Sequence, residues 1–215
     1  MNLRLGMRGA ALWWALGFIT VTLGLQWLPG VAQSWRFERS AYGSGAWWQL
    51  LAAQFVHWNN LHAAVNALGF TVLLLAFQKL VAGPLQALAL LGGYAGVAVV
   101  VALDANCAQY AGASGALHGL LAGSALALLL PVTTPSRSMV DSHTRTQWLG
   151  GLILLGLAIK LWVQHDGGGA QSPGWLGFAT YYPAHEAGTA GGLVAVLSAL
   201  ALQRFRLVPG PGRST

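Results

Sequence analysis

The sequence predicts an all-α membrane protein in which six transmembrane helices form one bundle. Of its 215 residues, 55% are hydrophobic and only 7% are charged, whereas about 25% are charged in an average soluble domain. The 29 glycines and 8 prolines follow no G-X-Y period and lie inside apolar runs, which excludes collagen-like and disordered chains. The same composition excludes an ordinary water-soluble enzyme.

Each span is predicted from an apolar run of about 20 residues, the length that crosses a bilayer. The runs are residues 10–28, 61–77, 83–103, 112–130, 148–163 and 182–202. Polar or charged residues interrupt the second, fifth and sixth runs, and Lys160 lies inside the fifth. We therefore expect a membrane domain over residues 10–203, between a cytoplasmic N-terminus of residues 1–9 and a cytoplasmic tail of residues 204–215.

The positive charges predict the orientation of the spans. With both termini in the cytoplasm, most of the eleven Lys and Arg residues face inward and only Arg36 and Arg39 face outward. This distribution follows the positive-inside rule and explains the pI of about 10.1. Because the basic residues form no continuous patch, we expect no nucleic-acid partner.

The segment of residues 29–60 is too long for a simple connector between the first two spans. Together with Trp27 at its edge it holds five of the ten tryptophans, namely Trp27, Trp35, Trp47, Trp48 and Trp58. Tryptophan prefers the headgroup layer, so we expect a long loop lying in the outer membrane interface. His57 is interpreted as a structural hydrogen-bonding residue of this loop.

The single cysteine, Cys107, excludes a disulfide framework and a cysteine-rich zinc site, so we expect no cofactor. Cys107 is interpreted as a small packing residue. His185-Glu186 begins like the zinc motif H-E-x-x-H, but Thr189 stands at the position of the second histidine, and no metal is expected.

An aspartyl intramembrane protease needs two acids within spans. Asp104, Asp141 and Asp166 all fall in predicted loops, which excludes this class.

Polar side chains gather at one predicted depth of the membrane. The second, fourth and sixth spans descend from the outer face, so their N-terminal turns meet there. These turns carry His62 and Asn66, Ser114 and His118, and His185 and Glu186. Ionisable groups are costly inside a membrane, so this layer is the candidate functional site.

Ser114 lies in Gly112-Ala113-Ser114-Gly115, where a loop becomes a helix. A helix start preceded by glycine offers free N–H groups and a positive dipole end, as a nucleophilic serine requires. A helix N-cap is the alternative interpretation. The soluble G-x-S-x-G elbow is not matched, because Ala116 takes the place of its last glycine.

Two small-residue faces accompany these residues. His185 is followed by Gly188 and Gly192, and the fourth span carries Gly115, Gly119 and Gly123 at four-residue spacing. Such faces allow helix backbones to approach closely in lipid, and a Ser–His pair must come within about 3 Å. Generic helix packing is the alternative, but the equal depth of Ser114 and His185 favours a dyad.

His62 and Asn66 are four residues apart and share one helix face. Together with the N–H of Ser114 they offer donors for an oxyanion hole. A satisfied interhelical hydrogen bond is the alternative.

In this order, three motifs resemble the rhomboid intramembrane serine proteases over most of the chain: His57-x4-His62-x3-Asn66, Gly112-Ala113-Ser114-Gly115 and Ala184-His185-x2-Gly188-x3-Gly192. Trp47-Trp48-Gln49-Leu50-Leu51 and the stretch from Ser114 to Gly119 are most similar to the rhombosortase branch. The resemblance implies that Ser114 is the nucleophile, that His185 is the general base and acid, and that His62 and Asn66 donate to the oxyanion. The supporting residues would be Gly112, Gly115, His118, Gly188, Gly192 and His57.

Two departures from the family pattern stand out. Many rhomboids carry a tyrosine four residues after the serine, where this chain has His118. We expect His118 to stack flat under His185; the alternative is that it takes part in proton transfer or tunes His185. The Glu-x-Arg after the second span is replaced by Phe77-Gln78-Lys79. Glu186 points roughly 100° away from His185 on a helix, so we expect it to have an interhelical or interfacial partner.

The resemblance also implies a location and a substrate. The protease would lie in a bacterial inner membrane and cut exported transmembrane proteins near the outer face, at a Gly-rich C-terminal sorting signal of the GlyGly-CTERM type. The loop at residues 165–181 would cover a water-filled site. A rhomboid-like protein that binds membrane clients without cutting them is the alternative; a small transporter has no support from an inverted repeat.

Overall fold

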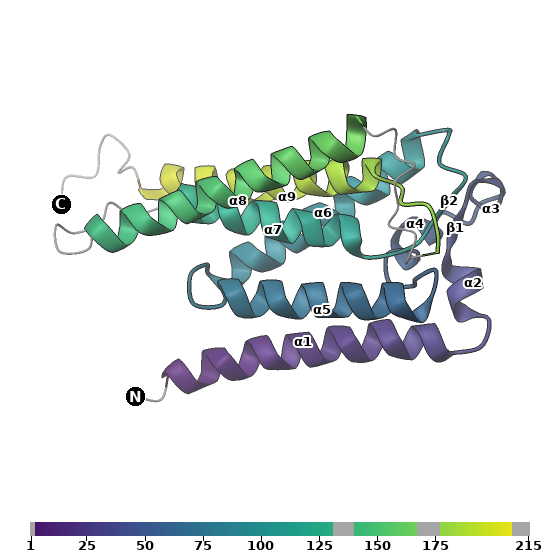
Figure 1. Ribbon diagram of the computed structural model, residues 1–215, viewed down its shortest axis with the longest axis horizontal. Coiled ribbons are helices and arrows are strands. Elements are labelled where there is room, and N and C mark those ends of the chain that lie inside the picture. The colour runs from purple at the N-terminus through teal and green to yellow at the C-terminus, as the bar shows by residue number, and fades with distance from the viewer. Residues whose placement is uncertain (1–2, 131–139, 167–176, 208–215) are drawn as a thin grey trace.

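The computed structural model describes residues 3–130, 140–166 and 177–207, which are almost entirely helical (Figure 1). The long helices are α1 (Leu3–Trp27), α5 (Asn60–Phe77), α6 (Gly83–Leu103), α7 (Ser114–Leu129), α8 (Val140–Asp166) and α9 (Pro183–Leu207). The short elements are α2 (Val31–Trp35), β1 (Phe37–Glu38), α3 (Arg39–Gly43), α4 (Gln49–Ala52) and β2 (Gln109–Tyr110). The predicted all-helical class is confirmed, with one two-residue strand pair added.

Several helices extend beyond the predicted apolar runs. α6 has the predicted bounds, whereas α1 begins at Leu3 and α8 covers Val140–Asp166. Asp141 and Asp166 therefore lie on a helix, and the expectation that they fall in loops was wrong. The reason is physical: an uncharged run marks the part of a helix that suits hydrocarbon, but the backbone hydrogen bonds of a helix continue into polar surroundings.

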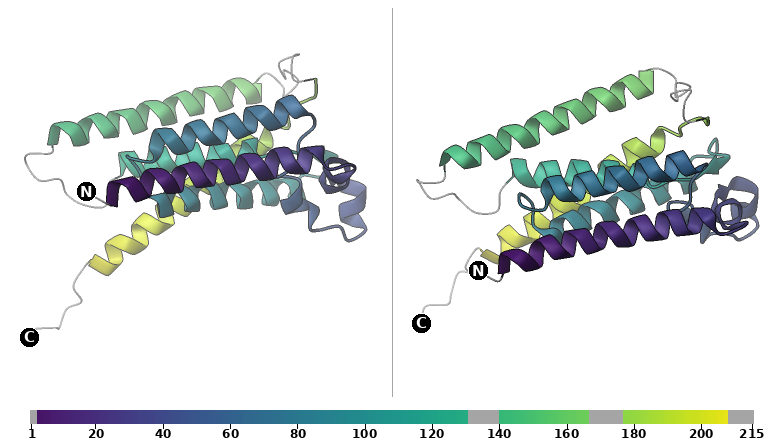
Figure 2. Two further views of the ribbon diagram at one scale, coloured as in Figure 1. Left: turned by 90° about the horizontal axis from the view of Figure 1, so that it is seen from below. Right: turned by 60° about the horizontal axis from the view of Figure 1, so that its bottom comes forward.

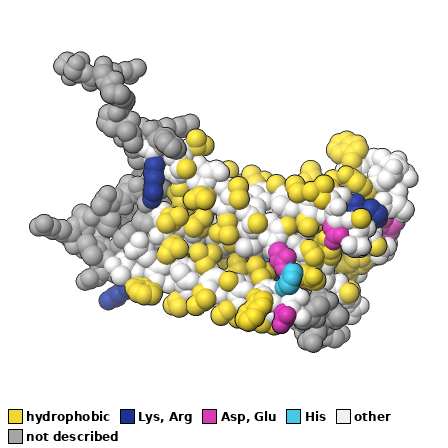
Figure 3. Space-filling model, turned by 90° about the horizontal axis from the view of Figure 1, so that it is seen from above, with side chains coloured by type: hydrophobic (Ala, Val, Ile, Leu, Met, Phe, Trp, Pro, Cys, Tyr) yellow, Lys and Arg dark blue, Asp and Glu magenta, His cyan; other side chains and the backbone are white. Residues whose placement is uncertain are grey.

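The chain is a membrane protein by the length and composition of its helices. Among the described residues, four stretches are long and apolar enough to cross a membrane: Asn60–Phe77, Gly83–Leu103, Thr144–Asp166 and Pro183–Arg204. α7 is apolar but shorter, with 16 residues. Large hydrophobic side chains are exposed on the outside, and Figure 3 shows them spread over one face with Lys and Arg towards its two ends. A surface of this kind suits lipid.

Three helices form the centre of the bundle. α6, α7 and α9 pack against one another, and α8 packs on α7. α5 contacts both α7 and α1. As a result, α1 and α8 lie at opposite margins of the bundle (Figure 2). α7 is accordingly the most enclosed helix, with buried residues on several faces.

The backbones of α7 and α9 touch at pairs of glycines. A Cβ atom added to Gly188 would overlap the carbonyl group of Gly115, and one added to Gly192 would lie 2.6 Å from the Cα atom of Gly119. α6 meets α9 in the same way, since a Cβ on Gly92 would lie 2.7 Å from that of Ala195. Small residues on facing helices allow this approach in lipid.

The segment between α1 and α5 is folded rather than extended. β1 pairs antiparallel with β2, so that Phe37 faces Tyr110 across the pair. The Arg39 guanidinium donates to the carbonyl of Ala102 in the last turn of α6 (2.9 Å) and to that of Cys107 in the connection that follows (3.2 Å). Free carbonyls at a helix C-terminus are favourable partners for a cation. The segment thereby anchors the connection that leads into α7.

Cys107 belongs to this anchor. Its side chain is 2% exposed and packs with Phe37, Tyr110 and Ala184. Burial raises the pKa of the Cys107 thiol, so the group stays protonated near neutral pH. These contacts agree with its interpretation as a packing residue.

Substituting Gly188→Val tests the backbone contact. Because the atoms nearest to the added Cβ belong to the Gly115 backbone, which cannot move aside as a side chain can, overpacking should cost about 3 kcal/mol. Thermal unfolding in detergent should show a clearly lower Tm. The matched control is Gly156→Val on α8, where an added Cβ meets no atom of the described residues within 4 Å; an equal loss in both variants would contradict the proposed contact.

Candidate active site

The polar residues singled out in the sequence lie at one end of the bundle. α5, α7 and α9 all begin at this end, next to β1 and β2 (Figure 1). His62 lies in the first turn of α5, Ser114 is the first residue of α7, and His185 is the third residue of α9. Side chains from three helices can therefore converge on one point.

Ser114 and His185 are direct neighbours. Ser114 Oγ lies 2.9 Å from His185 Nε2, and the imidazole is 5% exposed. The N-cap residue of α7 is Ala113, and no side-chain hydrogen bond from the part of the chain that the structure describes caps this helix. The serine hydroxyl thus faces the imidazole, and the alternative interpretation of Ser114 as an N-cap does not hold. A hydroxyl in this position can pass its proton to an adjacent base.

His118 lies flat against His185. Their ring centroids are 4.1 Å apart with an interplanar angle of 12°. His118 Nδ1 lies 2.7 Å from the carbonyl oxygen of Ser114, one turn away, and its Nε2 lies 2.8 Å from Lys160 Nζ. Both ring nitrogens of His118 thus hydrogen-bond to groups other than His185, and the two rings contact each other only by stacking, as one of the two expectations had it.

A side chain of α8, Gln164, lies beside the second nitrogen of the His185 imidazole. Gln164 Oε1 lies 3.2 Å from His185 Nδ1 and 2.9 Å from Lys160 Nζ. No role for Lys160 or Gln164 is predicted from the sequence. A charge inside an apolar run, with a polar residue four positions later on the same helix face, was the signal that identifies this pair.

His62 and Asn66 line the site from α5. The Trp58 N–H donates to His62 Nδ1 (3.5 Å), which leaves the His62 proton on Nε2. Asn66 Nδ2 donates to the His62 carbonyl at 2.9 Å, and an amide nitrogen has a second N–H to offer. Among the described residues, the hydrogen bonds of both side chains stay within residues 58–66, which does not favour the interhelical alternative.

Gly112 makes room for the His62 ring. A Cβ at this position would lie 2.9 Å from His62 Nε2 and 2.6 Å from its Cε1. The φ of Gly112 is +122°, which side chains with a Cβ rarely adopt. Only glycine satisfies both conditions, so the loop before Ser114 and the ring of His62 fit together.

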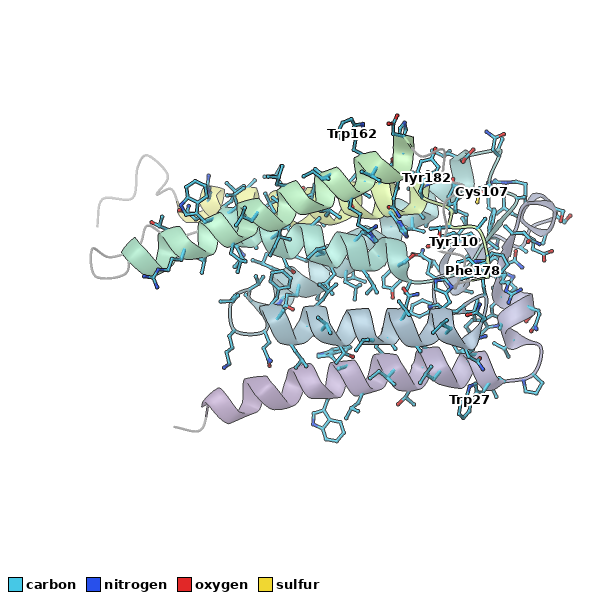
Figure 4. All side chains as sticks on the ribbon, viewed as in Figure 1. Trp27, Cys107, Tyr110, Trp162, Phe178 and Tyr182 are labelled. Carbon is cyan, nitrogen blue, oxygen red and sulfur yellow. The ribbon has the colours of Figure 1, made fainter. Side chains whose placement is uncertain are left out.

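A cavity of about 140 Å³ opens beside the serine. Its walls are Trp58, His62, Val65, Asn66, Gln109, Tyr110, Ala111, Ser114, Phe178, Ala179, Thr180, Tyr181 and His185. Figure 4 shows Tyr110 and Phe178 at this end of the bundle. One buried water needs only about 10–15 Å³, so the cavity has room for several beside the hydroxyl.

Two aromatic residues before α9 complete the cavity wall. The Phe178 ring lies 4.5 Å from that of His62, and the Tyr181 hydroxyl donates to Asp104 Oδ2 at 2.6 Å. This hydrogen bond is the largest cause that lowers the pKa of Asp104. This hydrogen bond holds the segment before α9 against the C-terminal end of α6.

His57 differs from its predicted role. Its side chain is fully buried, and neither ring nitrogen has a hydrogen-bond partner among the described residues. The ring packs edge-on against His62, with centroids 4.8 Å apart. Burial, with a smaller effect of His62, lowers the pKa of His57 to about 3, so the ring is neutral at physiological pH. Its side chain supports His62 by packing. Its hydrogen bonds run through the backbone, since the His57 N–H donates to Gln26 Oε1 at 3.2 Å and Arg36 donates to the His57 carbonyl at 3.3 Å, so the predicted hydrogen-bonding role belongs to the backbone and not to the ring.

Glu186 points away from the dyad. It pairs with His165 of α8 at 3.0 Å, between two exposed side chains, and this is the interhelical partner expected from the sequence. Residues 167–176 of the proposed covering loop lie outside the described residues.

Among the residues that the structure describes, no group of three or more His, Cys, Asp or Glu side chains is placed to hold a metal ion.

Comparisons with known proteins identify the family. The family model described as Rhomboid domain matches residues 44–202, which include all three motifs of the candidate site. No curated protein and no solved structure matches the chain. Because the match covers most of the sequence, the chain belongs to the rhomboid family.

Proposed function

We propose that this chain is an active intramembrane serine protease that uses a Ser114–His185 dyad. The observation that carries the proposal is the 2.9 Å distance between Ser114 Oγ and His185 Nε2, on the wall of a cavity. Rhomboid proteins are generally intramembrane serine proteases. A member that only binds clients has no need of a hydroxyl and an imidazole within hydrogen-bonding distance.

The reaction is an acyl transfer with water as the final acceptor. Ser114 Oγ attacks the carbonyl carbon of a substrate peptide bond while His185 Nε2 takes the hydroxyl proton. The same nitrogen returns the proton to the leaving amine as the C–N bond breaks. A water molecule from the cavity then attacks the acyl-enzyme with His185 as base, which releases the new carboxylate and restores Ser114.

His62 and Asn66 are proposed to bind the oxyanion formed in each half of the reaction. With its proton on Nε2, His62 is a donor towards Gly112 and the cavity. Asn66 lines the same cavity with one amide N–H to spare. The N–H of Ser114 adds a donor from the first turn of α7, where helix N–H groups have no partner within the helix.

The proposed setting is a six-span bundle in a bacterial inner membrane, with both termini in the cytoplasm. The positive-inside distribution of Lys and Arg supports this orientation. It puts the starts of α5, α7 and α9, and hence the dyad, near the periplasmic face. Exposed Trp27 and Trp47 lie at the same end of the fold, as expected of side chains in the headgroup layer.

The proposed substrates are exported proteins that end in a Gly-rich sorting signal, a transmembrane stretch and a basic tail. The support is the motif likeness to the rhombosortase branch around Trp47 and Ser114.

Replacing Ser114 by Ala should lower proteolysis by about four orders of magnitude or more, because the nucleophile is lost. A fluorophosphonate probe should label the wild-type protein at Ser114 and leave S114A unlabelled. The control is Ser124→Ala, a buried serine of α7 whose hydroxyl has no partner among the described residues; it should stay active. Cleavage by folded S114A would disprove the proposal.

Replacing Asn66 by Ala should lower kcat roughly 100-fold with little change in KM, since an oxyanion donor acts in the transition state. Steady-state cleavage of a membrane substrate measures both constants. Asn60→Ala, at the exposed start of the same helix, provides the control. An N66A enzyme with normal kcat would remove Asn66 from the oxyanion hole.

Substrate choice can be tested with two membrane segments of equal length. The purified protein should cut the segment that carries a Gly-rich C-terminal signal, near its glycines, and should cut a generic rhomboid substrate more slowly. Mass spectrometry locates the cuts. Equal cleavage of both segments, or cleavage of the generic one alone, would contradict the branch assignment but not the protease.

A further inference from the structure

We infer that Lys160 and Gln164 of α8 are positioning residues that fix the tautomer of His185. The inference rests on the proposed protease function and goes beyond it, because it names what takes the place of the carboxylate of a serine triad. The residues involved lie on three helices: Ser114 and His118 on α7, Lys160 and Gln164 on α8, and His185 on α9.

A Ser–His dyad works only in one protonation pattern. The nitrogen that faces the serine must carry a lone pair, so a neutral imidazole must hold its proton on the other nitrogen. In a triad an aspartate accepts that proton's hydrogen bond and fixes the pattern. Here the group beside His185 Nδ1 is the side-chain amide of Gln164, which is able either to accept or to donate.

Lys160 decides which end of the amide faces the histidine. An ammonium has three donors and no acceptor, so the Gln164 atom 2.9 Å from Lys160 Nζ must be the oxygen. The same oxygen lies 3.2 Å from His185 Nδ1, and a carbonyl oxygen has lone pairs for two donors. His185 Nδ1 therefore carries the proton, and Nε2 presents its lone pair to Ser114.

The same ammonium fixes the second imidazole. Lys160 donates to His118 Nε2 at 2.8 Å, so the His118 proton lies on Nδ1 and is donated to the Ser114 carbonyl at 2.7 Å. His118 then has no free donor to offer to His185, and its ring serves as a flat support 4.1 Å away. A single donor-only group on α8 thus orders the protons of both rings.

This role accounts for a charge within a membrane helix. An ammonium at membrane depth is costly unless it is hydrogen-bonded, and Lys160 reaches two acceptors that both belong to the site. Lys160 and Gln164 are four residues apart, so one face of α8 presents both. α8 packs on α7, and this packing brings the pair to the dyad.

The test compares four variants of the full-length protein in detergent. Q164L removes the acceptor, Q164N keeps an amide that is too short to reach, and Q164E keeps an acceptor of the same length. Q147L is the matched control, since Gln147 lies on the same helix but donates to the Leu129 carbonyl, at 3.4 Å, and not to a residue of the site. Thermal unfolding checks that each variant is folded.

Two readouts separate positioning from structural support. The ¹⁵N spectrum of histidine-labelled protein reports which ring nitrogen of His185 is protonated, with H185A used for assignment. The rate of fluorophosphonate labelling at Ser114, together with kcat and KM for a membrane substrate, reports the consequence for catalysis.

Q164L and Q164N should show a mixed His185 tautomer, and kcat should fall roughly 10- to 100-fold with KM unchanged, because the base is present in the wrong form part of the time. Q164E and Q147L should retain the single tautomer and most of the activity. Unchanged His185 signals and labelling in Q164L and Q164N would overturn the inference alone. If wild-type protein is not labelled at Ser114, the proposed function fails, and this inference fails with it.

Discussion

The contact between the backbones of α7 and α9 is the constraint on which the candidate site depends. A serine side chain is short, so its hydroxyl reaches an imidazole on another helix only if the two helices nearly touch. Gly115 directly follows Ser114, and Gly188 follows His185 by one turn; their backbones meet without intervening side chains. The 2.9 Å distance between the two functional side chains follows from this contact.

The polar groups of α7 and α8 beside His185 are paired with one another, as expected in an apolar bundle. Without bulk water, an unpaired donor or acceptor is costly. Lys160, Gln164 and His118 satisfy one another and the Ser114 carbonyl. At the same end, the β1–β2 pair and Arg39 hold the connection between α6 and α7, so that the loop before Ser114 is fixed by contacts with the segment between α1 and α5 as well as by the helices.

Much of the fold and part of the site could be predicted from the sequence. Apolar runs locate helices because hydrocarbon requires them, and α6 was predicted with its observed bounds. Hydropathy does not detect the polar ends of a helix, so α8 extends beyond the predicted run of residues 148–163. A pair of two-residue strands has no periodicity to detect. Gln164 alone, one uncharged polar residue near the end of a span, carries no signal; only its spacing of four residues from Lys160 indicates a role.

The sequence by itself determined the class of protein, the order of the helices and the motifs that identify the rhomboid family, since these depend on composition and spacing along the chain. The tertiary structure alone decided the partners of each polar side chain. The stacking of His118 and the approach of Gln164 to His185 both depend on how each helix is rotated about its axis. That rotation is set by packing between helices, which spacing within one helix does not encode.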